Sequence, residues 1–312
     1  MEEKNSIKIA IKKLFAGELV IFPTETVYGL GADATNSDAV KKIYKVKNRP
    51  FNNPIISHFR NLEKVNDHVE LNDIAIKLAN FFWPGPLTLI LKKKESSTIS
   101  PYVSNHNELI GCRVPNHSIV QEIFQSFDLP IAAPSANISE KLSTTNISHL
   151  DKEFKKNIFT INGGDCNLGL ESTVINVFSN TPRILRYGSI SVEEIKDIIP
   201  EIKSDIIKDK NTLSPGKQLK HYSPNIPIRI NVNNVYEGEV LLNFGLNNLV
   251  SNIYELNLSS TGDLKEAAKN FFDYLHKLDC NKYKGIAVAP IPNLGLGKTM
   301  NDRLIRASTI NR

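Results

Sequence analysis

The segment Phe-Pro-Thr-Glu-Thr-Val-Tyr-Gly-Leu-Gly, residues 22–31, is the most informative stretch of this 312-residue chain. It continues a β-prone run at 18–22, which a proline closes. Ligands bind at the strand ends of open α/β sheets, because the sheet fixes side chains there and leaves them exposed at its rim. Thr24 is therefore a candidate ligand contact. Taken alone, the segment is more typical of a turn that Gly29 and Gly31 permit and Thr24 caps.

Strand and helix patterns alternate through the first 200 residues. Apolar residues share one helical face over 37–47, after an Asn-Ser cap, and again over 72–83, before Pro-Gly-Pro. Strands are expected at 54–59, 87–91, 109–114, 130–133, 158–161, 172–178 and 183–187, and further helices near 117–127 and 191–199. This order predicts an α/β fold with an open, twisted sheet of mixed strand direction and flanking helices.

The character of the chain changes after Pro200. Residues 201–227 are rich in Lys, Asp and Ser without a helical or strand period, and we interpret them as a linker. Strands at 228–232, 240–244 and 285–290, with helices at 263–277 and 300–308, predict a smaller, Rossmann-like α/β domain. The expected organisation is thus a first domain at 1–200, a linker at 201–227 and a second domain at 228–312.

Composition excludes several classes of protein. The contents of 41% hydrophobic and 23% charged residues are typical of a globular chain. The net charge of +5 suits phosphate-bearing ligands but does not indicate a protein that coats nucleic acid. Neither a secretory signal nor an apolar run of about 18 residues is present. The three cysteines, Cys112, Cys166 and Cys280, form no Cys-x-x-Cys pair, so we expect no disulfide framework and no protein-held metal site. A cytoplasmic protein without membrane attachment is expected.

Cations and hydroxyls recur at the ends of predicted elements. Lys47 and Arg49 end a helix, where they could grip a polyphosphate or only complement the helix dipole. Arg113 lies in a β-prone run, and its burial requires either an anionic ligand or an internal acid. The other members are Thr24, Ser135, Asn137, Ser172, Thr173 and Arg186. Without a nucleophile–base pair or a metal triad, this set suits catalysis by positioning and charge stabilisation, as in phosphoryl or nucleotidyl transfer.

One family shows these motifs in this order. The segment 22–31, Lys-x-Arg at 47–49, Asn-Pro-Ile-Ile-Ser-His at 53–58, Pro-Gly-Pro-Leu-Thr at 84–88, Arg-Val-Pro at 113–115 and Pro-Ser-Ala-Asn at 134–137 resemble the YrdC-type threonylcarbamoyl-AMP synthases. The linker, with His-Tyr-Ser-Pro at 221–224, and the segment 295–307 resemble the long form with an extra C-terminal domain. The resemblance covers nearly the whole chain.

The resemblance implies a nucleotidyltransferase that joins L-threonine, bicarbonate and ATP into threonylcarbamoyl-adenylate and releases pyrophosphate. A separate transferase then uses the product to modify tRNA. Lys47 and Arg49 are the implied catalytic residues. The implied threonine contacts are Thr24, His58, Arg113, Ala133 and Thr173, with Ser172 as an alternative to Thr173. The implied ATP contacts are Lys47, Arg49, Asn53, Ser135, Asn137, Ser143, Arg186 and Tyr222, the last folding back over the nucleotide from the linker.

The chemistry of this reaction agrees with the residues. Converging negative charges need cations, and Mg²⁺ would be held mostly by the phosphates, since no carboxylate cage is evident. Carbamates are labile in water, so a linker that closes over the site would protect the intermediate. Two alternatives stay open: a non-catalytic RNA-binding module of the same fold, and the related chemistry of hydrogenase-maturation proteins, whose zinc-binding cysteine pairs this chain lacks. A weak direct contact with tRNA is also left open.

Overall fold

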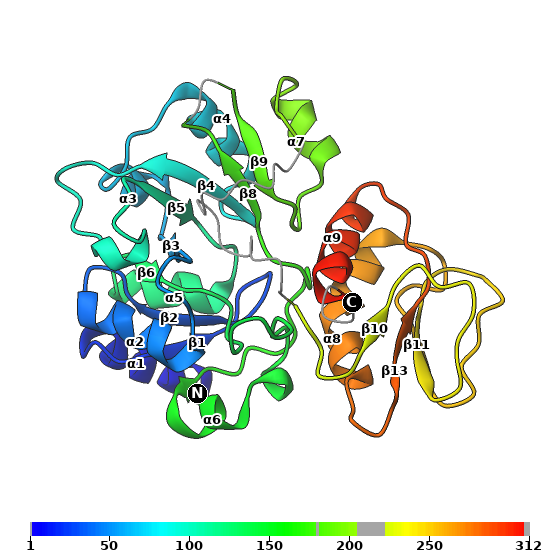
Figure 1. The fold of residues 1–312 in the computed structure, drawn as a ribbon. Helices are drawn as coiled ribbons and strands as arrows, with labels where there is room; N and C mark the ends of the chain where they lie inside the picture. The colour runs from blue at the N-terminus through cyan, green and yellow to red at the C-terminus, as the bar shows by residue number, and fades with distance from the viewer. Residues whose placement is uncertain (1, 179–180, 205–221, 309–312) are drawn as a thin grey trace.

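A computed structural model describes residues 2–178, 181–204 and 222–308. These residues form two sheets, one of nine strands and one of four. Figure 1 shows the larger sheet with its helices on the left and the smaller one on the right. The predicted boundary near residues 200–227 lies between the last strand of the first sheet and the first strand of the second. Among the described residues, no helix is long and apolar enough to cross a membrane.

The first sheet is mixed, as the sequence predicts. Its strand order is β7-β1-β2-β6-β3-β5-β4-β8-β9, in which β3 and β5 run parallel while β2 and β6 run antiparallel. The strands are β1 Val20–Phe22, β2 Gly29–Asp33, β3 Ile56–His58, β4 Leu87–Lys92, β5 Leu109–Arg113, β6 Ile131–Ala132, β7 Phe159–Thr160, β8 Thr173–Asn176 and β9 Arg183–Arg186.

Helices cover both faces of this sheet. They are α1 Glu2–Phe15, α2 Ser37–Lys47, α3 Leu62–Asn66, α4 Asp73–Phe82, α5 Ser118–Ser126, α6 Lys152–Asn157 and α7 Val192–Ile198. Ile21 and Leu30 belong to one hydrophobic core, and their chain neighbours Val20 and Phe22 belong to another that includes residues of α1 and α5. This alternation places one core on each face of the sheet, since successive strand residues point to opposite faces.

Local chemistry fixes the helix that leads into the Lys-x-Arg motif. Asn36 caps α2 by accepting hydrogen bonds from the backbone N–H groups of Asp38 and Ala39. Asn48 ends the helix in the left-handed conformation, with φ of 50°. The chain therefore turns sharply at Asn48, between Lys47 and Arg49, and the two cations face different surroundings.

The interpretation of residues 29–31 as a turn is wrong, because they begin strand β2. Gly29 and Gly31 pair with Phe22 and Val20 of β1. A Cβ atom on Gly31 would lie 2.4 Å from the Phe22 ring, so a larger residue could not pack there. The glycines thus serve close packing between strands, and the actual loop is residues 23–28.

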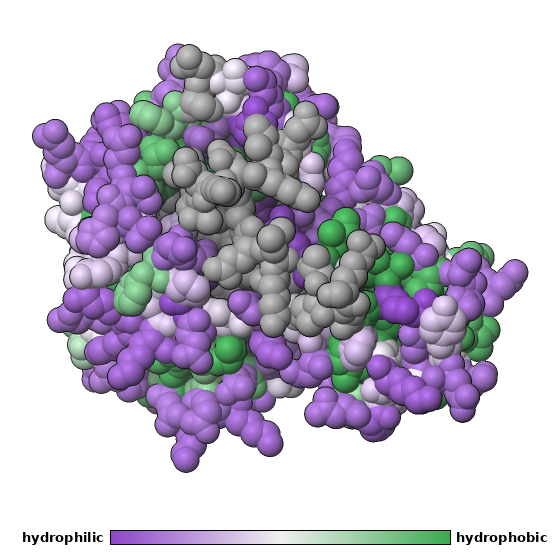
Figure 2. All heavy atoms as spheres, viewed as in Figure 1, coloured by the Kyte–Doolittle hydropathy of each residue, from purple (hydrophilic) through white to green (hydrophobic). Residues whose placement is uncertain are grey.

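The second domain contains a parallel sheet covered by two long helices. Strands β10 Ile228–Arg229, β13 Gly285–Val288, β11 Glu239–Asn243 and β12 Glu255–Asn257 lie in that order. Helices α8 Leu264–Leu278 and α9 Leu296–Ser308 lie between this sheet and the first domain (Figure 1). On the face that Figure 1 also shows, the coloured residues of Figure 2 are mostly hydrophilic, with smaller hydrophobic areas on both domains.

Helices α8 and α9 connect the two domains. On α9, Lys298 forms an ion pair with Glu193 at 2.7 Å, and the Thr299 hydroxyl donates to the Gly188 carbonyl at 2.9 Å. On α8, His276 Nε2 lies 3.0 Å from the Ser143 carbonyl oxygen. The Gly-Leu-Gly-Lys-Thr segment, 295–299, thus leads into a helix and contacts the first domain.

Candidate active site

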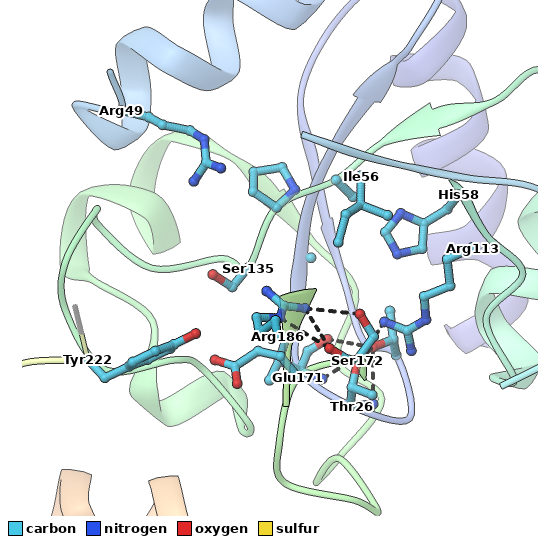
Figure 3. A pocket seen from close by; sticks show the side chains of 15 residues that line it. Thr26, Arg49, Ile56, His58, Arg113, Ser135, Glu171, Ser172, Arg186 and Tyr222 are labelled. Atoms are coloured by element: carbon cyan, nitrogen blue, oxygen red, sulfur yellow. Dashed lines mark hydrogen bonds between the residues drawn. The ribbon is translucent and has the colours of Figure 1, made fainter. Parts of the chain in front are cut away.

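A pocket opens where the site motifs of the first domain meet Tyr222 (Figure 3). Its walls surround about 590 Å³ of space between atoms, part of it open to solvent. Its lining consists of Thr24, Thr26, Val27, Gly29, Arg49, Ile56, His58, Arg113, Ala133, Pro134, Ser135, Glu171, Ser172, Arg186 and Tyr222. Segments separated by up to 200 residues in the sequence therefore share one cavity.

Thr24 caps the loop after β1, and its side chain also lines the pocket. It follows β1 and is buried in the pocket wall. Its hydroxyl accepts from the N–H of Thr26 and of Val27, each at 3.2 Å, and donates to the Val27 carbonyl at 2.7 Å. Thr24 thus fixes the β1–β2 loop and also lines the cavity.

His58 and Arg113 are neighbours across two parallel strands. They end β3 and β5 and are register partners. Burial, together with the charge of Arg113, lowers the pKa of His58 to about 3, so its imidazole is neutral at physiological pH. His58 Nδ1 is buried and has no hydrogen-bond partner among the described residues. A neutral ring nitrogen is therefore free to bind a polar group of a ligand.

An internal acid compensates the buried charge of Arg113. Arg113 Nη2 lies 2.7 Å from Glu25 Oε1, and both side chains are more than nine-tenths buried. Arg113 also donates to the Thr26 hydroxyl at 3.0 Å and to the Gly85 carbonyl at 3.2 Å. Of the two explanations open from the sequence, an internal carboxylate is thus present, while Arg113 still lines the pocket.

Arg49 reaches the pocket from the end of α2, held by the chain that follows it. Its Nε and Nη2 donate to the carbonyls of Asn53 and Pro54 at 2.9 and 2.7 Å, and Nη2 donates to Asn53 Oδ1 at 2.6 Å. Burial, with a contribution from Arg186, lowers the pKa of Arg49 to about 10. Arg49 therefore stays cationic at neutral pH. Asn53 does not line the pocket, and it positions Arg49.

Lys47 lies behind the pocket wall. Its ammonium donates to the backbone carbonyls of Ser135 and Asn137, the first at 2.5 Å. Burial, followed by the charge of Arg49, lowers the pKa of Lys47 well below its usual value. The structure thus gives Lys47 a role in shaping the loop that carries Ser135, and its predicted contact with nucleotide stays a prediction.

Arg186 and Ser172 are joined at the far side of the cavity. Arg186 donates to the Ser172 carbonyl through Nε at 3.2 Å and Nη2 at 2.8 Å, and to the Ser172 hydroxyl at 3.0 Å. Gly188 makes this approach feasible, because a Cβ atom there would lie 2.3 Å from the Ser172 carbonyl carbon. Arg186 is thereby fixed at the end of β9.

Ser172, and not Thr173, lines the pocket. The Thr173 hydroxyl donates to the Ile190 carbonyl at 2.8 Å and accepts from the Ile190 N–H at 3.0 Å. Because these backbone groups occupy it, the hydroxyl serves to hold the chain after β9. Of the two residues carried over for the same role, the structure therefore favours Ser172.

Two further predicted contacts lie outside the lining. Asn137 donates to the carbonyls of Ile138 and Lys141 at 2.9 and 2.8 Å. The Ser143 hydroxyl donates to Glu171 Oε1 at 2.6 Å. Both side chains support the walls of the pocket, so direct nucleotide contact through either stays a prediction.

Sequence reasoning missed Thr26 and Glu171 in the lining. Thr26 binds Arg113 and lies in the same motif as Thr24, so its position two residues on was the available signal. Glu171 precedes Ser172, but its partner Arg303 lies 132 residues away, with Nε 3.1 Å from Glu171 Oε2. Burial raises the pKa of Glu171, but Arg303, Arg186 and the Ser143 hydroxyl outweigh it and hold the pKa at about 2.

Comparisons with known proteins agree with this geometry. The family model Sua5_yciO_yrdC, described as telomere recombination, matches residues 12–188, and the model described as threonylcarbamoyl-AMP synthase, C-terminal domain, matches residues 190–309. A threonylcarbamoyl-AMP synthase of Bacillus subtilis is 36% identical, covering 93% of this chain and 89% of the relative. A putative synthase of Methanocaldococcus jannaschii is 35% identical over 62% of this chain and 91% of the relative.

A solved structure is similar over nearly the whole chain. The crystal structure of Pyrococcus abyssi Sua5 complexed with L-threonine has a TM-score of 0.89 and 33% identity, covering 97% of this chain and 94% of that one. The fold expected from the sequence is thus confirmed, including the second domain. The chain belongs to the Sua5/YciO/YrdC family and carries the C-terminal domain of its threonylcarbamoyl-AMP synthases.

Proposed function

We propose that this chain is a threonylcarbamoyl-AMP synthase, which forms threonylcarbamoyl-adenylate and pyrophosphate from L-threonine, bicarbonate and ATP. The observation that carries the proposal is the composition of one pocket. Arg113, His58 and Ser172 can bind an amino acid, while Arg49 and Arg186 can bind a triphosphate in the same cavity. Named relatives and a similar threonine-bound structure support the assignment.

The strand side of the pocket would bind threonine. Arg113 can hold the carboxylate in a charge-assisted pair, because its planar guanidinium suits carboxylate geometry. The neutral His58 ring and the hydroxyls of Thr24 and Ser172 can bind the polar groups of the substrate. Ala133 leaves room beside them. The threonine amine would then form the carbamate, either by attacking CO₂ with loss of a proton or by attacking bicarbonate with release of water.

The other side would stabilise transfer to the nucleotide. The carbamate oxygen attacks the α-phosphorus, the bond to the β,γ-phosphates breaks, and pyrophosphate leaves. Arg49 and Arg186 are fixed by backbone carbonyls before any ligand binds, so they can stabilise this developing charge without reorganising. Ser135 would contribute a hydroxyl, and Tyr222 an aromatic face, at the nucleotide end.

Mg²⁺ would accompany ATP in this proposal. The described residues contain no group of three or more His, Cys, Asp or Glu side chains placed to hold a metal. Both oxygens of Glu171, the carboxylate that lines the pocket, are engaged by Ser143 and Arg303. These side chains fit an ion held mainly by phosphate oxygens, whose charge it would partly neutralise.

Two parts of the proposal extend beyond the pocket. We propose that the product passes to a separate tRNA threonylcarbamoyl transferase and that the protein acts in the cytoplasm. The expected closure of the linker over the site falls mainly on residues 205–221, which lie outside the described residues. It stays a prediction, supported by the place of Tyr222 in the pocket lining.

Pyrophosphate release tests the proposed reaction. With ATP and Mg²⁺ present, release should require both L-threonine and bicarbonate, each withheld in a separate reaction. Carbamoyl phosphate should not replace that pair, which separates this chemistry from that of hydrogenase maturation. Release that is indifferent to threonine would overturn the assignment, as would salt-sensitive tRNA binding without ATP consumption.

A further inference from the structure

A buried arginine of the second domain reaches the active-site wall. Arg303 lies on α9, and its side chain is only 1% exposed. Its Nε lies 3.1 Å from Glu171 Oε2, and its Nη2 donates to the Tyr187 carbonyl at 2.7 Å. Its Nη1 contacts Asp302 at 2.5 Å. Burying a guanidinium destabilises the fold unless its N–H groups find acceptors. Here Nε, Nη1 and Nη2 of Arg303 each have one.

Both site residues that Arg303 touches line the pocket. One is Glu171, whose other oxygen accepts from Ser143 of the first domain at 2.6 Å. The other is Tyr222, whose ring centre lies 4.7 Å from the Arg303 guanidinium carbon and 5.7 Å from the Phe272 ring of α8. Figure 3 shows Glu171 and Tyr222 on the same side of the cavity. Two helices of the second domain thus hold part of the pocket wall.

The position of Glu171 matters for its neighbours. Ser172 follows it directly, and the Ser172 carbonyl and hydroxyl hold Arg186 through three hydrogen bonds. A shift of Glu171 therefore moves Ser172 and the guanidinium that it orients. The contacts of Lys298 with Glu193 and of Thr299 with Gly188, which are also made from α9, involve no residue of the pocket lining.

We propose that Arg303 is a positioning residue for the reaction, through which the second domain completes the nucleotide end of the pocket. It holds Glu171, and with it Ser172 and Arg186, on one side and the Tyr222 ring on the other. The inference rests on the proposed function. It assigns the C-terminal domain a part in catalysis, beyond merely being attached to the first domain.

Replacement of Arg303 should also change the pH dependence. The charged and titratable groups facing Glu171 are Arg303 on α9, Arg186 on β9 and Tyr222. Without Arg303, fewer groups oppose the rise in pKa that burial causes, so the pKa of Glu171 should lie above its wild-type value and its protonation at lower pH would weaken the pocket wall. Activity should then fall as the pH is lowered through that raised pKa, whereas the wild-type enzyme keeps the carboxylate ionised down to about pH 2.

The experiment compares Arg303→Met and Arg303→Lys with Lys298→Ala, which removes an exposed interdomain ion pair. Pyrophosphate release is measured from pH 5 to 8, with melting temperature as a check on folding. Arg303→Met should lower kcat/KM for ATP by about tenfold, less than the loss of a donor that touches the substrate, because Arg303 acts only through Glu171, Ser172 and Tyr222. The activity of Arg303→Met should also fall at acidic pH. Adding Glu171→Gln to Arg303→Met should remove this acidic fall. Arg303→Lys should recover part of the loss.

Each outcome decides the proposal. A folded Arg303→Met variant with the activity and pH profile of Lys298→Ala would overturn it, because Arg303 would then be an interdomain contact only. If Arg303→Met does not fold, Arg303→Lys decides on the same two readouts, and a wild-type profile there overturns the proposal. If the wild-type enzyme itself releases no threonine-dependent pyrophosphate, the proposed function fails instead, so the two failures are distinguishable.

Discussion

Strands carry the proposed threonine end of the pocket, whereas the second domain supports its proposed nucleotide end. His58 and Arg113 are register partners on adjacent strands, and Glu25 pairs with Arg113 from the same domain. Glu171 and Tyr222, in contrast, depend on Arg303 from a helix of the other domain. In the proposed reaction, threonine would thus face a wall fixed by the sheet, while the end that would admit ATP and release pyrophosphate is assembled between domains.

The largest effect should follow from breaking the strand end. Arg113→Leu leaves Glu25 buried without its partner, so the free energy of unfolding should fall by about 3–5 kcal/mol. Threonine-dependent pyrophosphate release should be lost as well. Urea denaturation and the KM for threonine measure the two effects. Adding Glu25→Leu should restore much of the stability but none of the threonine-dependent release. An Arg113→Leu variant that keeps both its stability and its threonine-dependent release would contradict the assignment of Arg113.

Arg49→Ala tests the charge at the nucleotide end. Removing one preorganised donor from a site of charge development typically costs a factor of about 10²–10³ in kcat, and we expect a loss of that size. Steady-state pyrophosphate release measures it. Arg60→Ala is the matched control, because Arg60 is about half exposed and pairs loosely with Asp128 at 3.8 Å. Equal activities of the two variants would remove Arg49 from the mechanism.

Tyr222→Ala should have a smaller effect than Arg49→Ala. The ring lines the pocket but bears no formal charge, so product formation should fall by about tenfold, or about 1.4 kcal/mol in barrier height. Because the ring is buried against Phe272 and Arg303, the melting temperature should fall as well, so activity is measured well below it. Tyr236→Ala, at a ring that is 55% exposed in the second domain, is the control. Unchanged turnover in Tyr222→Ala would count against a role for this residue over the nucleotide.

The smallest effects separate two neighbouring hydroxyls. Ser172→Ala should raise the KM for threonine a few-fold and lower the free energy of unfolding by about 1 kcal/mol, because its buried hydroxyl accepts from Arg186 and pairs with Thr88. Thr173→Val should lower the free energy of unfolding by about 1–2 kcal/mol, because it leaves the Ile190 backbone without its buried partner. Its KM should stay near the wild-type value. The reverse pattern would return Thr173 to the set of threonine contacts.

Much of the fold could be predicted because local signals were strong. Helix α2 matches its predicted bounds, since Asn36 caps it and apolar residues share one face. Strand β2 could not be predicted, because glycine is rare in strands and the reason for Gly31 lies in its packing against Phe22. The helix predicted at 300–308 begins four residues earlier, at Leu296, because Gly297 is a poor helix former and weakens the helical pattern there.

The candidate site shows the same limit. Residues within motifs, such as Thr24, Arg49 and Arg186, could be selected from the sequence because their side chains suit charged ligands. The sequence could not predict whether a side chain faces the cavity. Thr173 and Lys47 show this, because the polar end of each side chain is hydrogen-bonded to backbone groups of another segment. The link from Arg303 to Glu171 likewise spans 132 residues, so only the folded chain reveals it.

A crystal structure with L-threonine and a non-hydrolysable ATP analogue tests the central claim most directly. We expect the threonine carboxylate within hydrogen-bond distance of Arg113, and the phosphates between Arg49 and Arg186, in one continuous cavity. Tyr222 should lie beside the nucleotide. Binding of either ligand on another face of the molecule, with Arg49 and Arg113 left without ligand, would contradict the account.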